Sequence, residues 1–138
     1  MLLHKLVVAS RRSLHVFIFL IAFVSSLAQA ANSAPEISLQ DLKKAVDEKK
    51  VFLIDANGTG SYKSGHIPGA IHYSKHEEKL ASVLPADKSS LIVAYCGGPM
   101  CSAWEDAAKE AQKAGYTNVK HLKAGIKGWK EAKYPTDI

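Results

Sequence analysis

Arginine is absent from most of this 138-residue chain. Arg11 and Arg12 are its only arginines, and with Lys5 they lie in the first thirty residues, which contain no acidic residue. Residues 31–138 therefore carry fifteen lysines against thirteen acidic residues, a net charge of +2 instead of the +5 of the whole chain. Because the lysines are scattered and not interleaved with aromatic side chains, the basic excess is no evidence for nucleic-acid binding.

Cysteine is scarce as well. The two cysteines, Cys96 and Cys101, are five positions apart. Two cysteines in a protein of an oxidising compartment ordinarily form a structural disulfide. A bridge that closes so short a loop, however, removes little entropy from the unfolded chain. The spacing therefore favours a chemical role for the thiols, and it leaves open whether they are joined in the resting protein.

The first thirty residues differ in kind from the rest. Three basic residues precede the apolar run 14–24, and residues 28–30, Ala-Gln-Ala, have the small-x-small pattern of a signal peptidase site. The pattern predicts a signal peptide over residues 1–30 and a periplasmic or secreted protein. An uncleaved anchor is the alternative, because the apolar run can be stretched to about 17 residues. Residues 10–12, Ser-Arg-Arg, hint at twin-arginine export, but the general secretory route fits better.

The composition indicates that the rest of the chain forms one globular domain. The chain is 47% apolar and 22% charged, and it shows no internal repeat. Residues 31–36, Ala-Asn-Ser-Ala-Pro-Glu, are small and polar and predict a flexible leader. The folded domain is therefore expected over residues 37–138.

Helical periodicity alternates with short apolar runs along this domain. Ser38 with Asp41, and Ser74 with Glu77, have capping-box spacing and predict the starts of two helices. A glycine-rich loop is expected over 56–70, with a helical turn at its centre. The order of elements predicts an α/β fold, a parallel sheet with helices on both faces. The expected helices cover residues 38–50, 74–84, 102–114 and 126–132, and the expected strands cover residues 51–54, 91–95 and 119–122.

Cys96 follows an expected strand directly, and a helix is expected to begin near Ser102. Ligands of parallel sheets bind at the carboxyl ends of the strands. A loop that curls round a sulfur at a helix N-terminus supplies backbone N–H donors that favour a thiolate, a persulfide anion or an oxyanion. Gly97 and Gly98 allow the backbone to approach closely. The alternative is a buried, inert cysteine that closes a strand.

Several blocks of this sequence resemble rhodanese domains. The most specific is Gly65–Ile71, Gly-His-Ile-Pro-Gly-Ala-Ile, which follows Asp55 and Tyr62, and Tyr95-Cys96, Gly115-Tyr116 and the block Gly125–Trp129 come after it in the family's order. The resemblance covers essentially all of residues 37–135. It implies a rhodanese-like fold and a two-step cycle in which Cys96 takes sulfur from a donor such as thiosulfate, forms a persulfide, and passes the sulfur to cyanide or a thiol.

Loop length separates two branches that share the fold implied by this resemblance. The sulfurtransferases have a six-residue loop, which matches Cys96 to Cys101. The related phosphatases and arsenate reductases need an arginine after five intervening residues to clamp an oxyanion. That position is Ser102, so phosphoester chemistry is not expected.

The loop itself is uncharged, although many thiosulfate-using members of the family have an arginine or lysine in or beside it. The substrate anion is therefore expected to rely on backbone amides, on Ser102, or on a lysine from elsewhere, with Lys63 and Lys127 as the two candidates. A polysulfide or protein persulfide is an alternative donor.

Cys101 departs from the family, in which this position varies. Three roles stay open: a resolving thiol that attacks the Cys96 persulfide, a soft-metal ligand with Cys96 and Met100, or a small residue at the helix start. His66 is expected to belong to a structural turn. Asp55 and Asn57 are expected either to line the pocket or to turn the backbone, and His72, His76 and His121 to lie at the surface.

The sequence therefore predicts a sulfurtransferase of the rhodanese type. No metal or organic cofactor is expected. The expected partners are a small sulfur-containing anion or persulfide donor and a thiol or cyanide acceptor. Binding to nucleic acid is not expected, nor to a membrane after signal cleavage. The protein is expected to be a monomer. The alternatives are a thiol redox or soft-metal binding module and a non-catalytic binding domain of the same fold. The predicted site consists of Cys96 as nucleophile and Gly97, Gly98, Pro99, Met100, Cys101 and Ser102 as substrate-binding residues.

Overall fold

The computed structural model of the protein describes residues 33–138. The predicted signal peptide, residues 1–30, lies outside the described residues, as do the first two residues of the predicted leader. Within residues 33–138 no helix is both long and apolar enough to cross a membrane.

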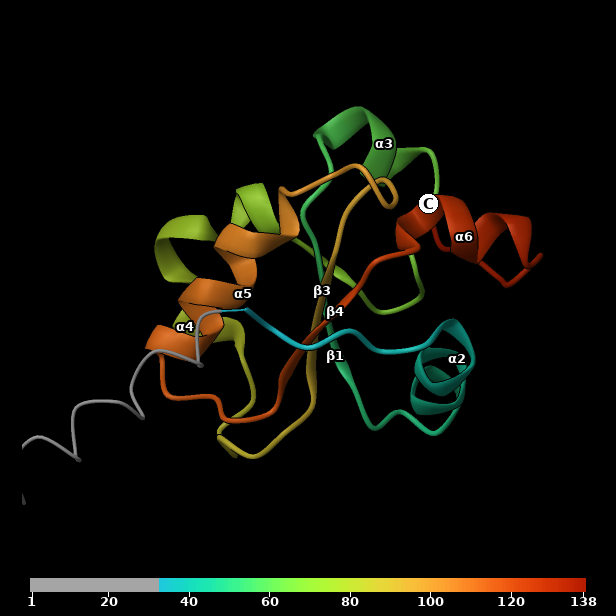
Figure 1. Cartoon of the computed structure of the whole chain (residues 1–138). Coiled ribbons are helices and arrows are strands. Elements are labelled where there is room, and N and C mark those ends of the chain that lie inside the picture. Colours follow the sequence, from blue (N-terminus) through green and yellow to red (C-terminus); the bar gives the residue numbers. More distant parts are fainter. Residues whose placement is uncertain (1–32) are drawn as a thin grey trace, which may run out of the picture. The chain divides into compact units, whose positions relative to one another are not determined.

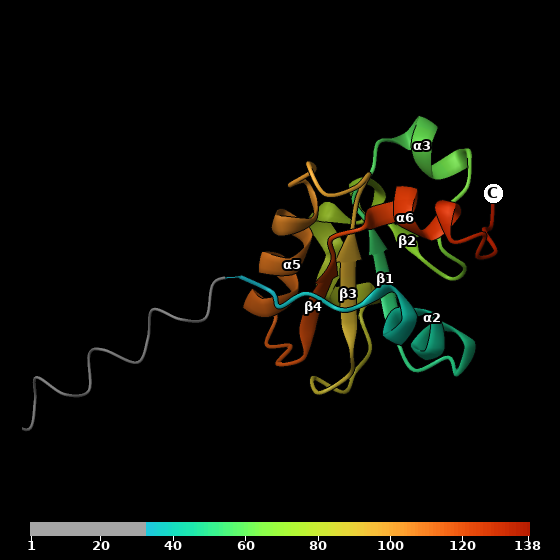
Figure 2. The same cartoon turned by 45° about the vertical axis from the view of Figure 1, so that its right-hand side comes forward.

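A four-stranded parallel sheet runs through the centre of the domain (Figures 1 and 2). The register pairs Asp55 with His72 on one side and with Tyr95 on the other, and Tyr95 pairs in turn with Leu122. All four strands therefore end at the same edge of the sheet, and the predicted parallel sheet is confirmed. The strands are β1 (Phe52–Asp55), β2 (Ile71–His72), β3 (Ile92–Tyr95) and β4 (Val119–Leu122), in the spatial order β2-β1-β3-β4.

Helices cover both faces of this sheet, as predicted. Because side chains alternate along a strand, Ile54 and Ala94 pack on one face with Leu80 and the α5 alanines, whereas Leu53 and Val93 pack on the other face with α2 and α6. Figures 1 and 2 show α4 and α5 on one side of the sheet and α2 and α6 on the other. The helices are α2 (Leu39–Asp47), α3 (Thr59–Lys63), α4 (Leu80–Val83), α5 (Trp104–Lys113) and α6 (Gly125–Glu131), with 3-10 turns η1 (Tyr73–Lys75) and η2 (Glu77–Lys79).

One predicted cap is confirmed and the other is wrong. Ser38 caps α2, because its Oγ accepts a hydrogen bond from the Asp41 amide at 3.0 Å. Ser74 begins no helix: it lies inside η1, and α4 starts only at Leu80. The reason is that the two-residue strand β2, too short to give a pattern in the sequence, holds the chain against β1 until His72, and the chain leaves the sheet through 3-10 turns.

Residues 34–36 of the predicted leader are held against the domain. Ala34 is buried at 3% exposure. The His121 amide of β4 donates to the Pro35 carbonyl, and the Ile37 amide donates to the His121 carbonyl, both at 2.9 Å, so that this segment adds a parallel bridge to the outer edge of β4. The sequence boundary at residue 37 is therefore wrong, because backbone pairing of a small polar segment leaves no apolar pattern.

Removal of this segment should weaken the domain. A chain that begins at Ile37 loses the bond to the Pro35 carbonyl, the bond from His121 Nδ1 to the Ala34 carbonyl (2.8 Å), and the buried Ala34 side chain. We expect its free energy of unfolding to be lower by about 1–3 kcal/mol than that of a chain beginning at Ser33, as measured by urea unfolding. Equal midpoints for the two chains would show that the segment contributes nothing.

Candidate active site

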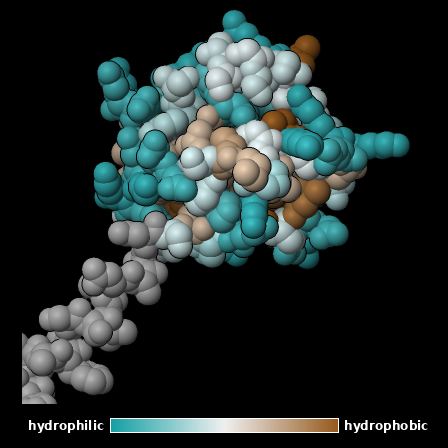
Figure 3. Space-filling model, turned by 45° about the horizontal axis from the view of Figure 1, so that its top comes forward, coloured by the Kyte–Doolittle hydropathy of each residue, from teal (hydrophilic) through white to brown (hydrophobic). Residues whose placement is uncertain are grey.

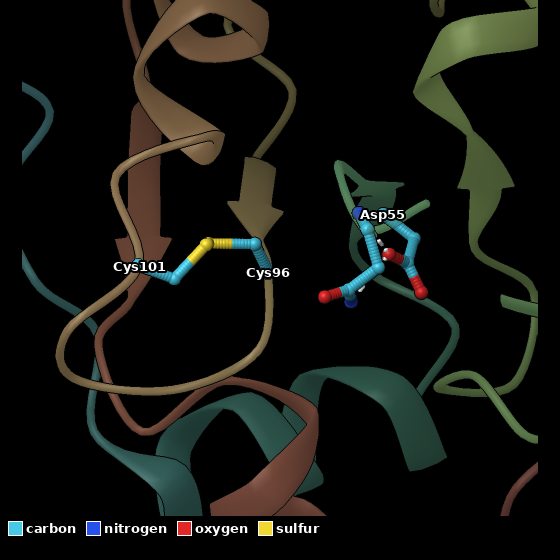
Figure 4. Close-up of a disulfide and its surroundings, with 4 residues drawn as sticks. Asp55, Cys96 and Cys101 are labelled. Atoms are coloured by element: carbon cyan, nitrogen blue, oxygen red, sulfur yellow. Dashed lines mark hydrogen bonds between the residues drawn. A yellow bond between two sulfur atoms is a disulfide. The ribbon is translucent and has the colours of Figure 1, made fainter. Parts of the chain in front are cut away.

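The two cysteines close a loop at the carboxyl end of β3. Cys96 follows Tyr95 and is 1% exposed, and Cys101 is half-buried. Their sulfur atoms form a disulfide, with the Cα atoms 6.3 Å apart. Figure 4 shows this bridge across the loop, with Asp55 nearby at the end of the neighbouring strand. The question that the sequence left open therefore has an answer: in this structure the two cysteines are joined.

The first residues of α6 hold the cysteine loop through two backbone hydrogen bonds. The amides of Ile126 and Lys127 donate to the carbonyls of Cys96 and Gly97, at 2.9 and 3.0 Å. Gly125 makes this approach possible, because its φ is +59° and a Cβ there would lie 2.5 Å from the Cys96 carbonyl oxygen. In the sequence, Gly125 is noted only as the first residue of the last block that resembles the family. Its place three residues after the end of β4, at the first residue of α6, is the signal for this closer role.

Most amides of the loop are free of protein partners. Within the described part of the chain, Cys101 N donates to Gly98 O at 3.0 Å, whereas the amides of Gly97, Gly98 and Met100 donate to no protein acceptor. These three unpaired donors lie in the loop that the two sulfur atoms close. Unpaired backbone N–H groups are groups to which an anion can bind.

Asp55 and Asn57 form the wall of the site on the β1 side. Asp55 is completely buried, and its Oδ1 accepts hydrogen bonds from Asn57 N and Nδ2, both at 2.7 Å. Within residues 33–138, Asp55 Oδ2 has no hydrogen-bond partner. A Cβ on Gly97 would lie 3.7 Å from Asn57 Oδ1, so the Asn57 side chain lies against the cysteine loop. The pair therefore both turns the backbone and lines the loop.

His72 is buried, and the prediction of a surface position is wrong. It is 2% exposed, its Nε2 donates to the Asn57 carbonyl at 2.9 Å, and its ring stacks on Tyr62 at 4.7 Å. The cause is its place in β2 opposite Asp55. His76 and His121 are half-buried, and the His121 ring stacks on Trp104 at 3.8 Å, so neither is freely exposed.

His66 belongs to a structural turn that precedes β2, as predicted. His66 Nδ1 donates to the Tyr62 carbonyl at 2.9 Å and the two rings stack at 3.8 Å. The Ile67 amide donates to Tyr95 Oη at 3.0 Å. Burial raises the pKa of Tyr95 far above its ordinary value, and the Asp55 carboxylate raises it further. Tyr95 is thus a neutral phenol that ties this turn to β3 beneath the cysteine loop.

The remaining predicted site residues lie on the outer side of the loop. Gly98 is half-buried, whereas Pro99, Met100 and Ser102 are exposed, Met100 at 99%. Lys127 lies alongside, since a Cβ on Gly98 would be 3.7 Å from Lys127 Cβ. Figure 3 brings this end of the molecule forward, and hydrophobic residues form small separate spots there among hydrophilic ones.

The described residues give no metal site. In the range 33–138 no three His, Cys, Asp or Glu side chains are grouped so that they could hold an ion. Both cysteine sulfur atoms of the predicted soft-metal alternative are engaged in the disulfide.

Comparison with known proteins identifies the family. The family model of the rhodanese-like domain matches residues 38–132, so the chain belongs to the rhodanese-like domain family. It is 36% identical over 121 residues to the HTH-type transcriptional regulator Rv0324 of Mycobacterium tuberculosis, covering 85% of this chain and 52% of the relative. It therefore spans about half the length of that relative.

Two further comparisons cover most of the other chain. The chain is 28% identical over 102 residues to the thiosulfate sulfurtransferase GlpE of Shewanella oneidensis, covering 73% of this chain and 97% of the relative. The solution structure of the rhodanese-like domain of the Anabaena Alr3790 protein is similar with a TM-score of 0.61 and 26% identity, covering 75% of this chain and 78% of that one. The fold predicted from the resemblance is thereby confirmed.

Substitution of Gly125 should disturb the cysteine loop specifically. Gly125→Ala places a Cβ in contact with the Cys96 carbonyl and strains a positive φ, so we expect a loss of about 2 kcal/mol or more in the free energy of unfolding. Gly58→Ala is the matched control, because a Cβ at Gly58 meets nothing within 4 Å. Thermal unfolding of both variants checks this, and two equally stable variants would contradict the role of Gly125.

Proposed function

We propose that the protein is a sulfurtransferase that moves sulfane sulfur from a donor such as thiosulfate to a thiol or cyanide through a persulfide on Cys96. The observation that carries the proposal is the position of Cys96: it directly follows β3 at the carboxyl edge of the sheet, in a glycine loop of which three amides donate to no acceptor among residues 33–138. The thiosulfate sulfurtransferase activity of the Shewanella relative supports the same chemistry.

The first half-reaction begins from the reduced protein. A Cys96 thiolate attacks the outer sulfur of thiosulfate, the sulfur–sulfur bond of the donor breaks, and sulfite leaves with the bonding electrons. Cys96 then carries a persulfide anion, which the loop amides stabilise as they stabilised the thiolate. In the second half-reaction an acceptor thiolate or cyanide attacks the terminal sulfur, and Cys96 is released as a thiolate.

The disulfide sets a condition on this cycle, because Cys96 is a nucleophile only after reduction. A thiol reductant is therefore required before the first turnover. Cys101 is half-buried and Cys96 is 1% exposed, so the sulfur of Cys101 is the one that an external thiol reaches. Attack there releases Cys96 as the thiolate that the cycle needs.

Lys127 is the lysine that we assign to the substrate anion. Its side chain lies along Gly98, and its Nζ is held only loosely, 3.9 Å from Glu131 Oε1 at an exposed position. It can therefore turn toward an anion above the loop without losing a strong contact. No metal or organic cofactor takes part in the proposed cycle.

We further propose that the protein is exported and acts as a monomer in the periplasm or outside the cell. The signal-like pattern of residues 1–30 motivates this. The Cys96–Cys101 disulfide supports it, because such bonds persist chiefly in oxidising compartments.

Cys96→Ser should abolish sulfur transfer. On mixing with thiosulfate, pre-reduced wild-type protein should first gain one sulfur, about 32 Da by intact mass, and cyanide added at that point should remove it. Cys96→Ser should gain nothing, and its thiosulfate:cyanide activity should fall by at least about a hundredfold. Transfer at the wild-type rate by Cys96→Ser would remove the basis of the proposal.

Lys127→Ala should weaken binding of the donor without removing the nucleophile. We expect its KM for thiosulfate to rise by about 3- to 10-fold, with a smaller change in kcat and a weaker dependence of KM on ionic strength. Lys113→Ala is the matched control, because it removes the same charge from the last turn of α5. Equal KM values for the two variants would assign anion binding to the loop amides alone.

The disulfide favours a second candidate function, a thiol redox module that exchanges electrons with other thiol proteins and carries no sulfur. In that case Cys101→Ala abolishes the thiol exchange activity, and reduced wild-type protein gains no sulfur from thiosulfate. Under the proposed sulfurtransferase function, Cys101→Ala still forms the persulfide.

A further inference from the structure

Once the disulfide has been reduced, Cys101 has no part in the transfer cycle described above. It is nevertheless positioned to bond with the sulfur of Cys96, since the structure joins the two across a loop with a Cα separation of 6.3 Å. The loop is anchored at one end by the α6 amides and tightened at the other by the bond from Cys101 N to Gly98 O. Cys101 therefore stays within reach of Cys96 when the disulfide is open.

We propose that Cys101 is a second catalytic residue that resolves the Cys96 persulfide, so that the protein releases the sulfur as hydrogen sulfide and reduces sulfane sulfur at the expense of external thiols. The inference rests on the proposed function, because it needs the persulfide on Cys96. It differs in the acceptor: the sulfur leaves as sulfide and is not passed to a thiol or to cyanide.

The resolving step balances as an ordinary thiol exchange. The outer sulfur of the persulfide first takes a proton from solvent. The Cys101 thiolate then attacks Cys96 Sγ, the bond between Sγ and the outer sulfur breaks, and that sulfur leaves with the electron pair as hydrosulfide. The outer sulfur is reduced to sulfide, and the two cysteines are oxidised to the disulfide seen in the structure. The disulfide is thus a state within the cycle as well as a resting state.

External thiols return the protein to its starting state. A first thiol attacks the half-buried Cys101 and leaves a mixed disulfide there, while Cys96, 1% exposed, departs as the thiolate. A second thiol, or the second group of a dithiol, then frees Cys101. Over one cycle thiosulfate and two thiols give sulfite, hydrogen sulfide and one external disulfide.

The direction of attack follows from burial. In the persulfide the buried atom is Cys96 Sγ, next to Cys101, and the outer sulfur extends away from it toward the substrate. An external thiol reaches the outer sulfur, whereas Cys101 is the thiol that reaches Sγ from within the loop. The choice between transfer and sulfide release is therefore a competition between an external thiol and Cys101.

A single-turnover experiment tests the inference. Reduced full-length mature protein, freed of reductant, receives one equivalent of thiosulfate in the absence of any acceptor, and intact mass and released sulfide are followed together. Wild-type protein should gain about 32 Da transiently and finish about 2 Da below its reduced mass, with one sulfide released per chain. Cys101→Ala and Cys101→Ser should stop at the gain of about 32 Da and release no sulfide.

The outcomes separate this inference from the function on which it rests. If wild-type protein keeps its extra sulfur as long as Cys101→Ala and releases no sulfide, the role of Cys101 is overturned and the sulfurtransferase proposal stands. If neither protein gains sulfur, both the sulfurtransferase proposal and the role of Cys101 are contradicted. A mixture of Cys96→Ser and Cys101→Ala should release no sulfide, and release at the wild-type rate would overturn resolution within one chain.

Discussion

Two hydrogen bonds, from the amides of Ile126 and Lys127 to the carbonyls of Cys96 and Gly97, hold the cysteine loop in place. They exist because Gly125 brings the start of α6 against the loop backbone, where any Cβ would collide. In the same loop, the amides of Gly97, Gly98 and Met100 donate to no protein acceptor among the described residues. Under the proposed function, these N–H groups are available to the anion that forms at Cys96.

The parallel register builds the rest of the site around that loop. Because β1 and β3 end at the same edge, Asp55 lies beside Tyr95, and Asn57 carries the contact on to Gly97. The buried phenol oxygen of Tyr95 in turn accepts a hydrogen bond from the Ile67 amide. The turn after His66 is therefore tied to the strand that precedes Cys96. The histidines and aromatic residues of this region thus support the backbone around the loop.

Much of this could be predicted from the sequence, for reasons that particular residues make clear. Apolar runs such as 91–95 predict buried strands, and the glycines around Cys96 predict a close-packed loop. The features that the sequence did not predict share one cause: they depend on the pairing of backbone groups and not on a pattern of side chains. β2 has two residues, the segment from Ala34 to Ile37 pairs with β4 through its backbone, and the burial of His72 follows from β2. Whether Cys96 and Cys101 are joined likewise depended on a distance that no spacing fixes.

The most direct test of the account is the location of the transferred sulfur. Reduced protein would be treated with thiosulfate, alkylated at once and digested, and the peptide that carries the extra sulfur would be identified by tandem mass spectrometry. The account predicts the additional sulfur on Cys96, at the end of β3 among the free amides. Stable sulfur on Cys101, with Cys96 alkylated directly, would contradict it.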